Sequence, residues 1–225
     1  AASKKYDYQF GLVSSIRLRG FYFQYTENYD SAIVYFHEYA RQCEHYKLQK
    51  QRIVGLADVA AIYMETQQYQ LAKQIYLQCL PMLDKGSTAR QVSMLHNNLA
   101  GAYQYLGMYD SALFYYKIAI QIDSREGDSI LLAERKSNIS EVLIPLGKYA
   151  LAKKYLEESM KFNIRNDRTD ALWYNYCNLG LLYLKLEDYQ KSEYYYELSR
   201  ALANTMQSKS KLSQSLSGLS KLYQD

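Results

Sequence analysis

Three asparagines recur 40 residues apart, and an aspartate occupies the preceding step of the same column: Asp58, Asn98, Asn138 and Asn178. A carboxamide offers one acceptor and two donors, so it can bond both the C=O and the N–H of a peptide group. The column therefore suits a site that holds an extended polypeptide backbone without reading its sequence. The alternative is that each asparagine bonds a neighbouring helix, since asparagine is otherwise a poor residue for a helix interior.

Residue patterns typical of catalysis are missing from the sequence. The three histidines, His37, His45 and His96, form no HExxH pair, the glycines are not grouped in a phosphate-binding loop, and GxSxG does not occur. Cys177 has no histidine near it in the sequence to activate its thiol. We therefore expect no enzyme activity, no catalytic residue, no metal site and no cofactor.

Composition favours a mostly helical protein that binds no nucleic acid directly and does not insert into a membrane. Among the 225 residues, 48% are hydrophobic, while Pro occurs twice and Gly ten times. The net charge of +4 is small for a nucleic-acid footprint, and no apolar run approaches the ~18 residues that span a bilayer. Three widely spaced cysteines indicate free thiols. A start at Ala1 without Met indicates a processed or excised piece.

A repeat of 40 residues carries the asparagine column. Its clearest register is a tyrosine at five successive steps: Tyr29, Tyr69, Tyr109, Tyr149 and Tyr189. Nine residues earlier stands a small residue: Gly20, Ala60, Ala100, Ser140 and Gly180. Seven residues later stands a large apolar one: Phe36, Tyr76, Tyr116, Leu156 and Tyr196. Steps of three and four place each set on one helix face, so every unit is an antiparallel helix pair whose small residue admits the partner's aromatic ring.

The register predicts eleven helices and no strand. First helices are expected near residues 10–26, 50–66, 90–106, 130–146 and 170–186, and each register tyrosine should open a second helix. One helix pair cannot bury both of its apolar faces, whereas stacked pairs can, so the units should form an array.

These columns resemble the tetratricopeptide repeat over residues 12 to 225. The best match is Leu99-Ala100-x-x-Tyr103-x-x-x-Gly107-x-Tyr109-x-x-Ala112-x-x-x-Tyr116-x-x-Ala119. The turn glycine is kept only at Gly107 and Gly147, the closing proline is missing, and the pitch is 40 residues rather than the family's usual ~34. Such long repeats are similar to those of kinesin light chains and bacterial peptide-sensing regulators.

The resemblance implies an all-α, right-handed superhelical solenoid of about five repeats plus a terminal helix. Within a single array over 1–225, we expect repeats at 8–47, 48–87, 88–127, 128–167 and 168–207. Residues 208–225 are then a cap or the first helix of a sixth repeat, and we favour a parent protein that continues beyond Asp225.

The resemblance also implies that the first helices line the concave, ligand-facing surface. One stripe of these helices is not used for packing and combines the asparagine column with exposed aromatic, Met and charged residues. We expect the peptide-binding residues to be Asn98, Asn138, Asn178, Asp58, Tyr105, Tyr174, Met94, Glu141 and Arg17. Acidic side chains in the middle of the stripe favour a ligand with a basic centre.

The sequence thus indicates a module that binds a protein or peptide in its concave groove, as the sensor or interaction region of a larger bacterial regulatory protein. The alternative is a structural scaffold or self-association module without a peptide ligand, and a homo-oligomer is compatible with either role. An RNA-binding repeat protein is disfavoured, because the stripe carries few basic groups.

Overall fold

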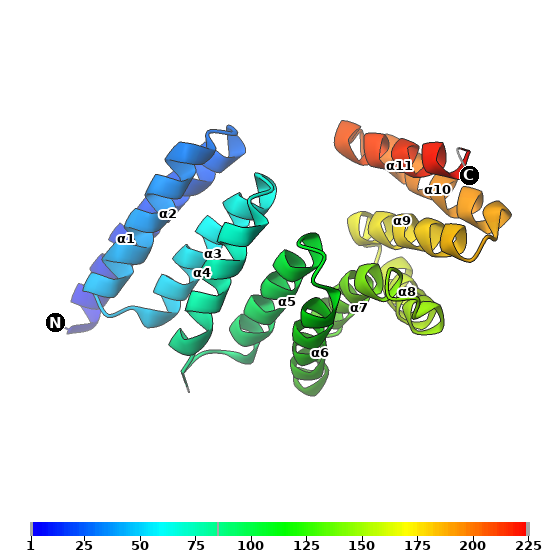
Figure 1. The fold of residues 1–225 in the computed structure, drawn as a ribbon. Helices are drawn as coiled ribbons and strands as arrows, with labels where there is room; N and C mark the ends of the chain where they lie inside the picture. The colour runs from blue at the N-terminus through cyan, green and yellow to red at the C-terminus, as the bar shows by residue number, and fades with distance from the viewer. Residues whose placement is uncertain (1, 85, 224–225) are drawn as a thin grey trace. The chain divides into compact units, whose positions relative to one another are not determined.

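A computed structural model describes residues 2–84 and 86–223, which form eleven α-helices, one short 3-10 helix and no strand (Figure 1). The first helices of the repeats are α1 (Ala2–Tyr25), α3 (Gln49–Glu65), α5 (Ala89–Tyr105), α7 (Ser129–Leu143), α9 (Thr169–Lys185) and α11 (Lys209–Leu222). The second helices are α2 (Tyr29–His45), α4 (Tyr69–Cys79), α6 (Tyr109–Glu126), α8 (Tyr149–Arg165) and α10 (Tyr189–Thr205). The predicted all-α array of helix pairs is confirmed.

The helix bounds follow the 40-residue register closely. All five second helices begin at the register tyrosines, as predicted. Two first helices differ from the prediction. Helix α1 begins at Ala2 rather than near residue 10, because no Gly or Pro interrupts the segment before Phe10. Helix α7 ends at Leu143, because Pro145 has no N–H to continue the helical hydrogen bonds.

A proline also shortens α4, which ends at Cys79 and passes into the 3-10 helix Leu80–Met82. Pro81 lies in this 3-10 helix and cannot donate the hydrogen bond that would extend α4. The chain resumes at α5, where Thr88 and Gln91 form a capping box. This connection is therefore the least regular of those between the repeats.

The other turns share one backbone solution, a left-handed residue just after each helix. Positive φ angles between 51° and 72° occur at 20-residue steps, at Glu27, Lys47, Gln67, Gly107, Gly127, Gly147, Asp167, Glu187 and Gln207. In each turn the next residue donates its N–H to a carbonyl five residues earlier, as Asn28 does to Phe23 at 2.9 Å. This is the Schellman arrangement, which satisfies the last helix carbonyls and reverses the chain.

Small residues on the first helices bring the two helices of a repeat into close contact. A Cβ added at Gly20 would lie 2.5 Å from the ring of Phe36, and one at Gly180 would lie 2.8 Å from Tyr196. The hydroxyl of Ser192 donates to the carbonyl of Gly180 at 2.9 Å, which ties the same pair of helices together. The predicted pairing of small and aromatic residues is confirmed for these two repeats.

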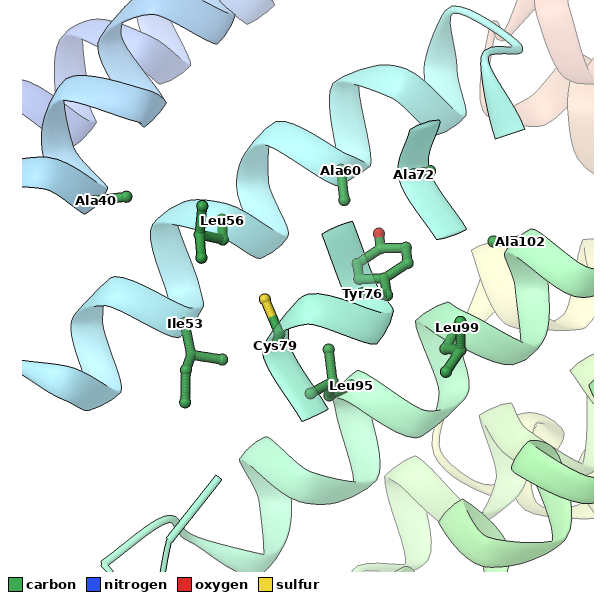
Figure 2. Packing of buried hydrophobic residues seen from close by; sticks show 10 residues of the cluster. All are labelled: Ala40, Ile53, Leu56, Ala60, Ala72, Tyr76, Cys79, Leu95, Leu99 and Ala102. Atoms are coloured by element: carbon green, nitrogen blue, oxygen red, sulfur yellow. The ribbon is translucent and has the colours of Figure 1, made fainter. Parts of the chain in front are cut away.

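A buried cluster contributed by α2, α3, α4 and α5 shows how successive repeats share one core (Figure 2). Its members are Ala40, Ile53, Leu56, Ala60, Ala72, Tyr76, Cys79, Leu95, Leu99 and Ala102. Tyr76 is 1% exposed, so its large ring is almost wholly removed from water. Each helix pair therefore completes the core of its neighbour, as expected for stacked repeats.

The chain divides into two compact units, residues 1–115 and 116–225, with the division inside α6. Across the ranges 2–84 and 86–223, every helix is too short or too polar to cross a membrane. Helices α1 to α5 belong to the first unit, and α7 to α11 belong to the second.

Candidate functional site

In the first unit, a pocket of about 180 Å³ lies among the first helices α1, α3 and α5. It is lined by Arg17, Ile53, Val54, Ala57, Asp58, Ala61, Gln91, Met94, Leu95 and Asn98. Four predicted site residues, Arg17, Asp58, Met94 and Asn98, therefore meet at one place. The pocket combines an apolar wall with polar groups at its edges, which is the usual composition of a ligand site.

Arg17 and Asp58 form a two-point ion pair that joins α1 to α3. The Nε of Arg17 lies 2.6 Å from Oδ2 of Asp58, and its Nη2 lies 3.1 Å from Oδ1. Burial raises the pKa of Asp58 although Arg17 opposes the rise, whereas the bond to Asp58 raises the pKa of Arg17. The guanidinium also lies 4.8 Å from the ring centre of Phe21. Asp58 is thus already engaged with a neighbouring helix.

Asn98 is half-buried at the opposite side of this pocket. Its Oδ1 accepts a hydrogen bond from Nδ2 of Asn97 at 3.2 Å. Met94, one helical turn earlier, is 43% exposed and offers a flexible apolar contact beside the carboxamide. The two side chains give the pocket one polar and one apolar contact for a ligand.

In the second unit, a pocket of about 350 Å³ contains Asn138 and Tyr174. Its full lining is Glu134, Ser137, Asn138, Asn163, Arg168, Asp170, Ala171 and Tyr174. Asn138 is half-buried on α7, and Tyr174 is 50% exposed on α9. The structure thus brings together two predicted residues from adjacent repeats.

Asn178 lines a further pocket of about 280 Å³ in the same unit, together with residues of α9, α10 and α11. Its Nδ2 donates to Oε1 of Glu141 at 3.2 Å, so two predicted residues from α9 and α7 bond to each other. Asn178 is buried, and this bond connects neighbouring first helices. For Asn178, as for Asp58, the column therefore also serves the contact between repeats.

Tyr105 does not line any of these three pockets. Its ring is 58% exposed and stacks on Tyr69, with centroids 4.8 Å apart and planes 11° apart. The stack ties the end of α5 to the start of α4. Tyr105 is therefore an exposed aromatic away from the asparagine column.

Sequence reasoning missed two pocket residues, Asn163 and Arg168, and the buried polar network beneath them. Nδ2 of Asn163 donates to Oδ1 of Asn175 at 2.7 Å, and Nδ2 of Asn175 donates to Ser159 and Ser137 at 3.0 and 3.2 Å. The signal was present: a polar pair twelve residues apart recurs one repeat earlier as Asp123 and Arg135. Polar residues at otherwise apolar repeat positions indicate a buried network.

The described side chains favour binding rather than bond-making chemistry. Burial raises the pKa of Cys43, Cys79 and Cys177 to about 11, so each thiol stays protonated and weakly nucleophilic at neutral pH. Across the described part of the chain, no three His, Cys, Asp or Glu side chains group as metal ligands would. What the pockets offer a ligand is hydrogen bonds, aromatic faces and apolar contact.

Two family models match the sequence, both described as tetratricopeptide repeat, at residues 90–165 and 174–204. No match was found among curated proteins. BtubC (BKLC) from P. vanneervenii is a similar solved structure, with a TM-score of 0.71 and 20% identity over 88% of this chain and 83% of that one.

Two further solved structures are similar over 89% of this chain. A Rap protein complexed with competence and sporulation factor gives a TM-score of 0.76 at 18% identity. Aspartyl phosphate phosphatase F from Bacillus subtilis gives 0.74 at 17% identity. The chain spans 56% and 52% of these two proteins. At such identities, the likeness establishes a shared fold.

Proposed function

Since this chain carries tetratricopeptide repeats and is a protein-interaction module, we propose that it binds a peptide in pockets on its first helices. We further propose that it serves as the sensor or interaction region of a larger bacterial regulatory protein. The Rap structure with its bound factor supports this reading, because a protein of the same fold holds a ligand of that kind. Recognition would rest on hydrogen bonds to the peptide backbone and on aromatic and Met contacts to its side chains.

The observation that carries the proposal is that every member of the carboxamide column lines a pocket. Asp58 and Asn98 line one pocket, and Asn138 and Asn178 each line another. A polar side chain spent wholly on packing would have no reason to return beside a cavity at each 40-residue step. Asp58 and Asn178 bond neighbouring helices, so Asn98 and Asn138 are the members we propose as the main peptide contacts.

The test is the double variant Asn98→Ala with Asn138→Ala, measured on an array of extended peptides of varied sequence. Each hydrogen bond from a carboxamide to a peptide group contributes about 0.5–1.5 kcal/mol net. If each asparagine makes two such bonds, the two substitutions weaken binding by roughly 2–6 kcal/mol, or about 30-fold to 10⁴-fold. The thermal unfolding midpoint should change little.

A matched control is Asn204→Ala, an exposed asparagine at the end of α10 that lines none of the three pockets. It should leave peptide binding unchanged. If the double variant loses stability but keeps its peptides, the asparagines join helices and do not contact the ligand.

A self-association role is the second candidate, and exposed apolar residues on α1 favour it. Leu18, Tyr22 and Tyr25 are 67%, 63% and 89% exposed. A contiguous exposed apolar surface commonly marks a protein contact. Light scattering after size-exclusion chromatography distinguishes the roles. A dimer that Leu18→Ser converts to a monomer, with no peptide bound on the array, would favour self-association.

A further inference from the structure

The pocket between α7 and α9 has a polar floor that the asparagine column does not explain. Asn163 and Ser137 line it and are 1% and 7% exposed. Buried polar side chains cost folding free energy unless they are hydrogen-bonded, so their presence at a cavity points to a built site. The pocket volume of about 350 Å³ lies within the usual range for ligand sites, about 300–1,000 Å³.

The network under the floor fixes the orientation of the Asn163 carboxamide. Its Nδ2 donates to Oδ1 of Asn175 at 2.7 Å and to Oγ of Ser159 at 3.3 Å. Asn175 uses its own Nδ2 to donate to Ser159 and Ser137. With the amide nitrogen of Asn163 committed, its Oδ1 is a buried acceptor without a hydrogen-bond partner.

Arg168, a second lining residue, has the complementary deficit. Its Nη2 donates to Oε1 of Glu134 at 2.6 Å, whereas its Nη1 is a buried donor without a partner. The ion pair with Glu134 holds the guanidinium in place, since two-point anchoring by the charge and the planar group restricts its motion. The pocket lining therefore includes one unused acceptor and one unused donor.

The charges around this pocket cancel in pairs. Glu134 pairs with Arg168, and Asp170 pairs with Lys211 from α11. A charged ligand group would have to break one of these pairs, so a neutral group is favoured. Tyr174, half exposed on α9, offers an apolar face for the methylene groups of a side chain.

We propose that this pocket binds the side-chain carboxamide of a glutamine or asparagine in the peptide, an inference that rests on the proposed function. The carboxamide N–H donates to Oδ1 of Asn163, and its C=O accepts from Nη1 of Arg168. A carboxylate would place its oxygen against the Asn163 acceptor, and an ammonium group would face the Arg168 cation. An aliphatic side chain would leave both protein atoms unbonded.

The probe is N-acetyl-glutamine methylamide, titrated into isotope-labelled protein and followed by NMR. The glutamate and leucine counterparts serve as matched compounds. We expect saturable shifts of the Asn163 and Arg168 side-chain signals with the glutamine compound alone, at a dissociation constant on the order of 1 mM. Equal shifts with all three compounds, or no saturable shift with the glutamine compound, would overturn the proposal.

Arg168→Lys tests the unused donor, because lysine keeps a positive charge beside Glu134 but lacks the second guanidinium nitrogen. It should weaken binding of the glutamine compound about tenfold. The matched control is Arg200→Lys, at an arginine paired with Glu197 that does not line this pocket. Ala171→Leu, which fills the pocket from α9, should abolish the shifts while far-ultraviolet ellipticity stays unchanged. Unaltered affinity in both pocket variants would contradict the assignment.

The peptide array separates this inference from the proposed function. If peptides bind without a preference for glutamine or asparagine at any position, the pocket assignment fails and the peptide-binding function stands. If no peptide binds while the glutamine compound still shifts Asn163 and Arg168, the function fails and the carboxamide pocket stands.

Discussion

At the residue scale, the repeat exchanges one buried polar pair for another at the same position. Arg135 and Asp123 approach to 3.3 Å between Nε and Oδ2, and both side chains are nearly inaccessible. Burial lowers the pKa of Arg135, although Asp123 opposes this effect. One repeat later, Asn163 and Asn175 replace the ions with a neutral hydrogen bond. A neutral pair carries a smaller desolvation cost than two buried charges, which leaves the later pair suited to the floor of a binding pocket.

The buried thiols predict a loss of stability in alkali. Folding raises the pKa of Cys79 from its ordinary 9.0 to about 11 because burial penalises the thiolate. Between these values the unfolded chain has already released the proton that the folded chain retains, so stability falls as the pH rises through this window. The loss from this group is at most about 2–3 kcal/mol.

Urea unfolding at pH 8 and pH 10.5 measures this dependence, with Cys79→Ala as the comparison. The variant is less stable at both pH values because it leaves a gap in the core, but its stability should fall less between them. A fall as steep as that of the unsubstituted protein would show that Cys79 does not contribute.

Gly218→Ala should destabilise the second unit by about 1–3 kcal/mol, the usual cost of overpacking. A Cβ at Gly218 would overlap the ring of Tyr196, and that ring cannot retreat because Gly180 of α9 is in close contact with it. The ordinary gain from replacing a helical glycine by alanine, about 1 kcal/mol, is outweighed.

Gly11→Ala is the matched control, because nothing lies within 4 Å of the Cβ that it adds. This exposed helical position should gain about 0.5–1 kcal/mol. Denaturant midpoints of the two variants check the opposite signs. A gain at Gly218 as well would mean that Tyr196 repacks without cost.

At the scale of elements, the turns set the length of every helix. Nine left-handed residues stand at 20-residue steps, and six of them are not glycine. A side chain in this conformation costs roughly 1–2 kcal/mol. The chain accepts this cost because the Schellman hydrogen bonds satisfy the carbonyls at the helix end. Turn geometry, rather than the turn glycine of the family pattern, preserves the register.

Glu187→Gly should therefore stabilise the protein by about 1 kcal/mol, since φ is 59° at this exposed turn and glycine adopts that angle without strain. Gly147→Ala, in the equivalent turn one repeat earlier with φ of 68°, should destabilise by a similar amount. Thermal unfolding of both variants provides the measurement. Equal effects of the same sign would contradict the role of the left-handed conformation.

At the scale of the whole molecule, the two compact units carry different reporters. The single tryptophan, Trp173, is 1% exposed in the second unit and donates through Nε1 to Ser215 of α11 at 3.0 Å. Its fluorescence reports on residues 116–225, whereas far-ultraviolet ellipticity reports on the helices of both units. Repeat proteins couple mainly through neighbouring repeats, so damage to one end need not spread along the chain.

In urea titrations of Gly218→Ala, the midpoint from Trp173 fluorescence should fall by roughly 1 M. The ellipticity midpoint should fall less, because the helices of the first unit keep their own contacts. Coincident midpoints for both probes would instead show that the chain unfolds in one cooperative step.

Sequence by itself determined the helix pairs, their 40-residue register and the tyrosines at which the second helices begin. It also indicated that Gly20 and Gly180 admit aromatic rings from the partner helix. These features follow from the 3.6-residue helix period and from side-chain size, which act over short distances along the chain. The asparagine column was visible for the same reason.

Only the tertiary structure decided which residues share a pocket and which bond one repeat to the next. Asp58 meets Arg17 across 41 residues, and Asn178 meets Glu141 across 37. Asn163 and Arg168, from the end of α8 and the following turn, join Asn138 at one pocket. Such meetings depend on how one helix pair stacks on the next, which is set by the summed packing of many side chains and leaves no periodic trace in the sequence.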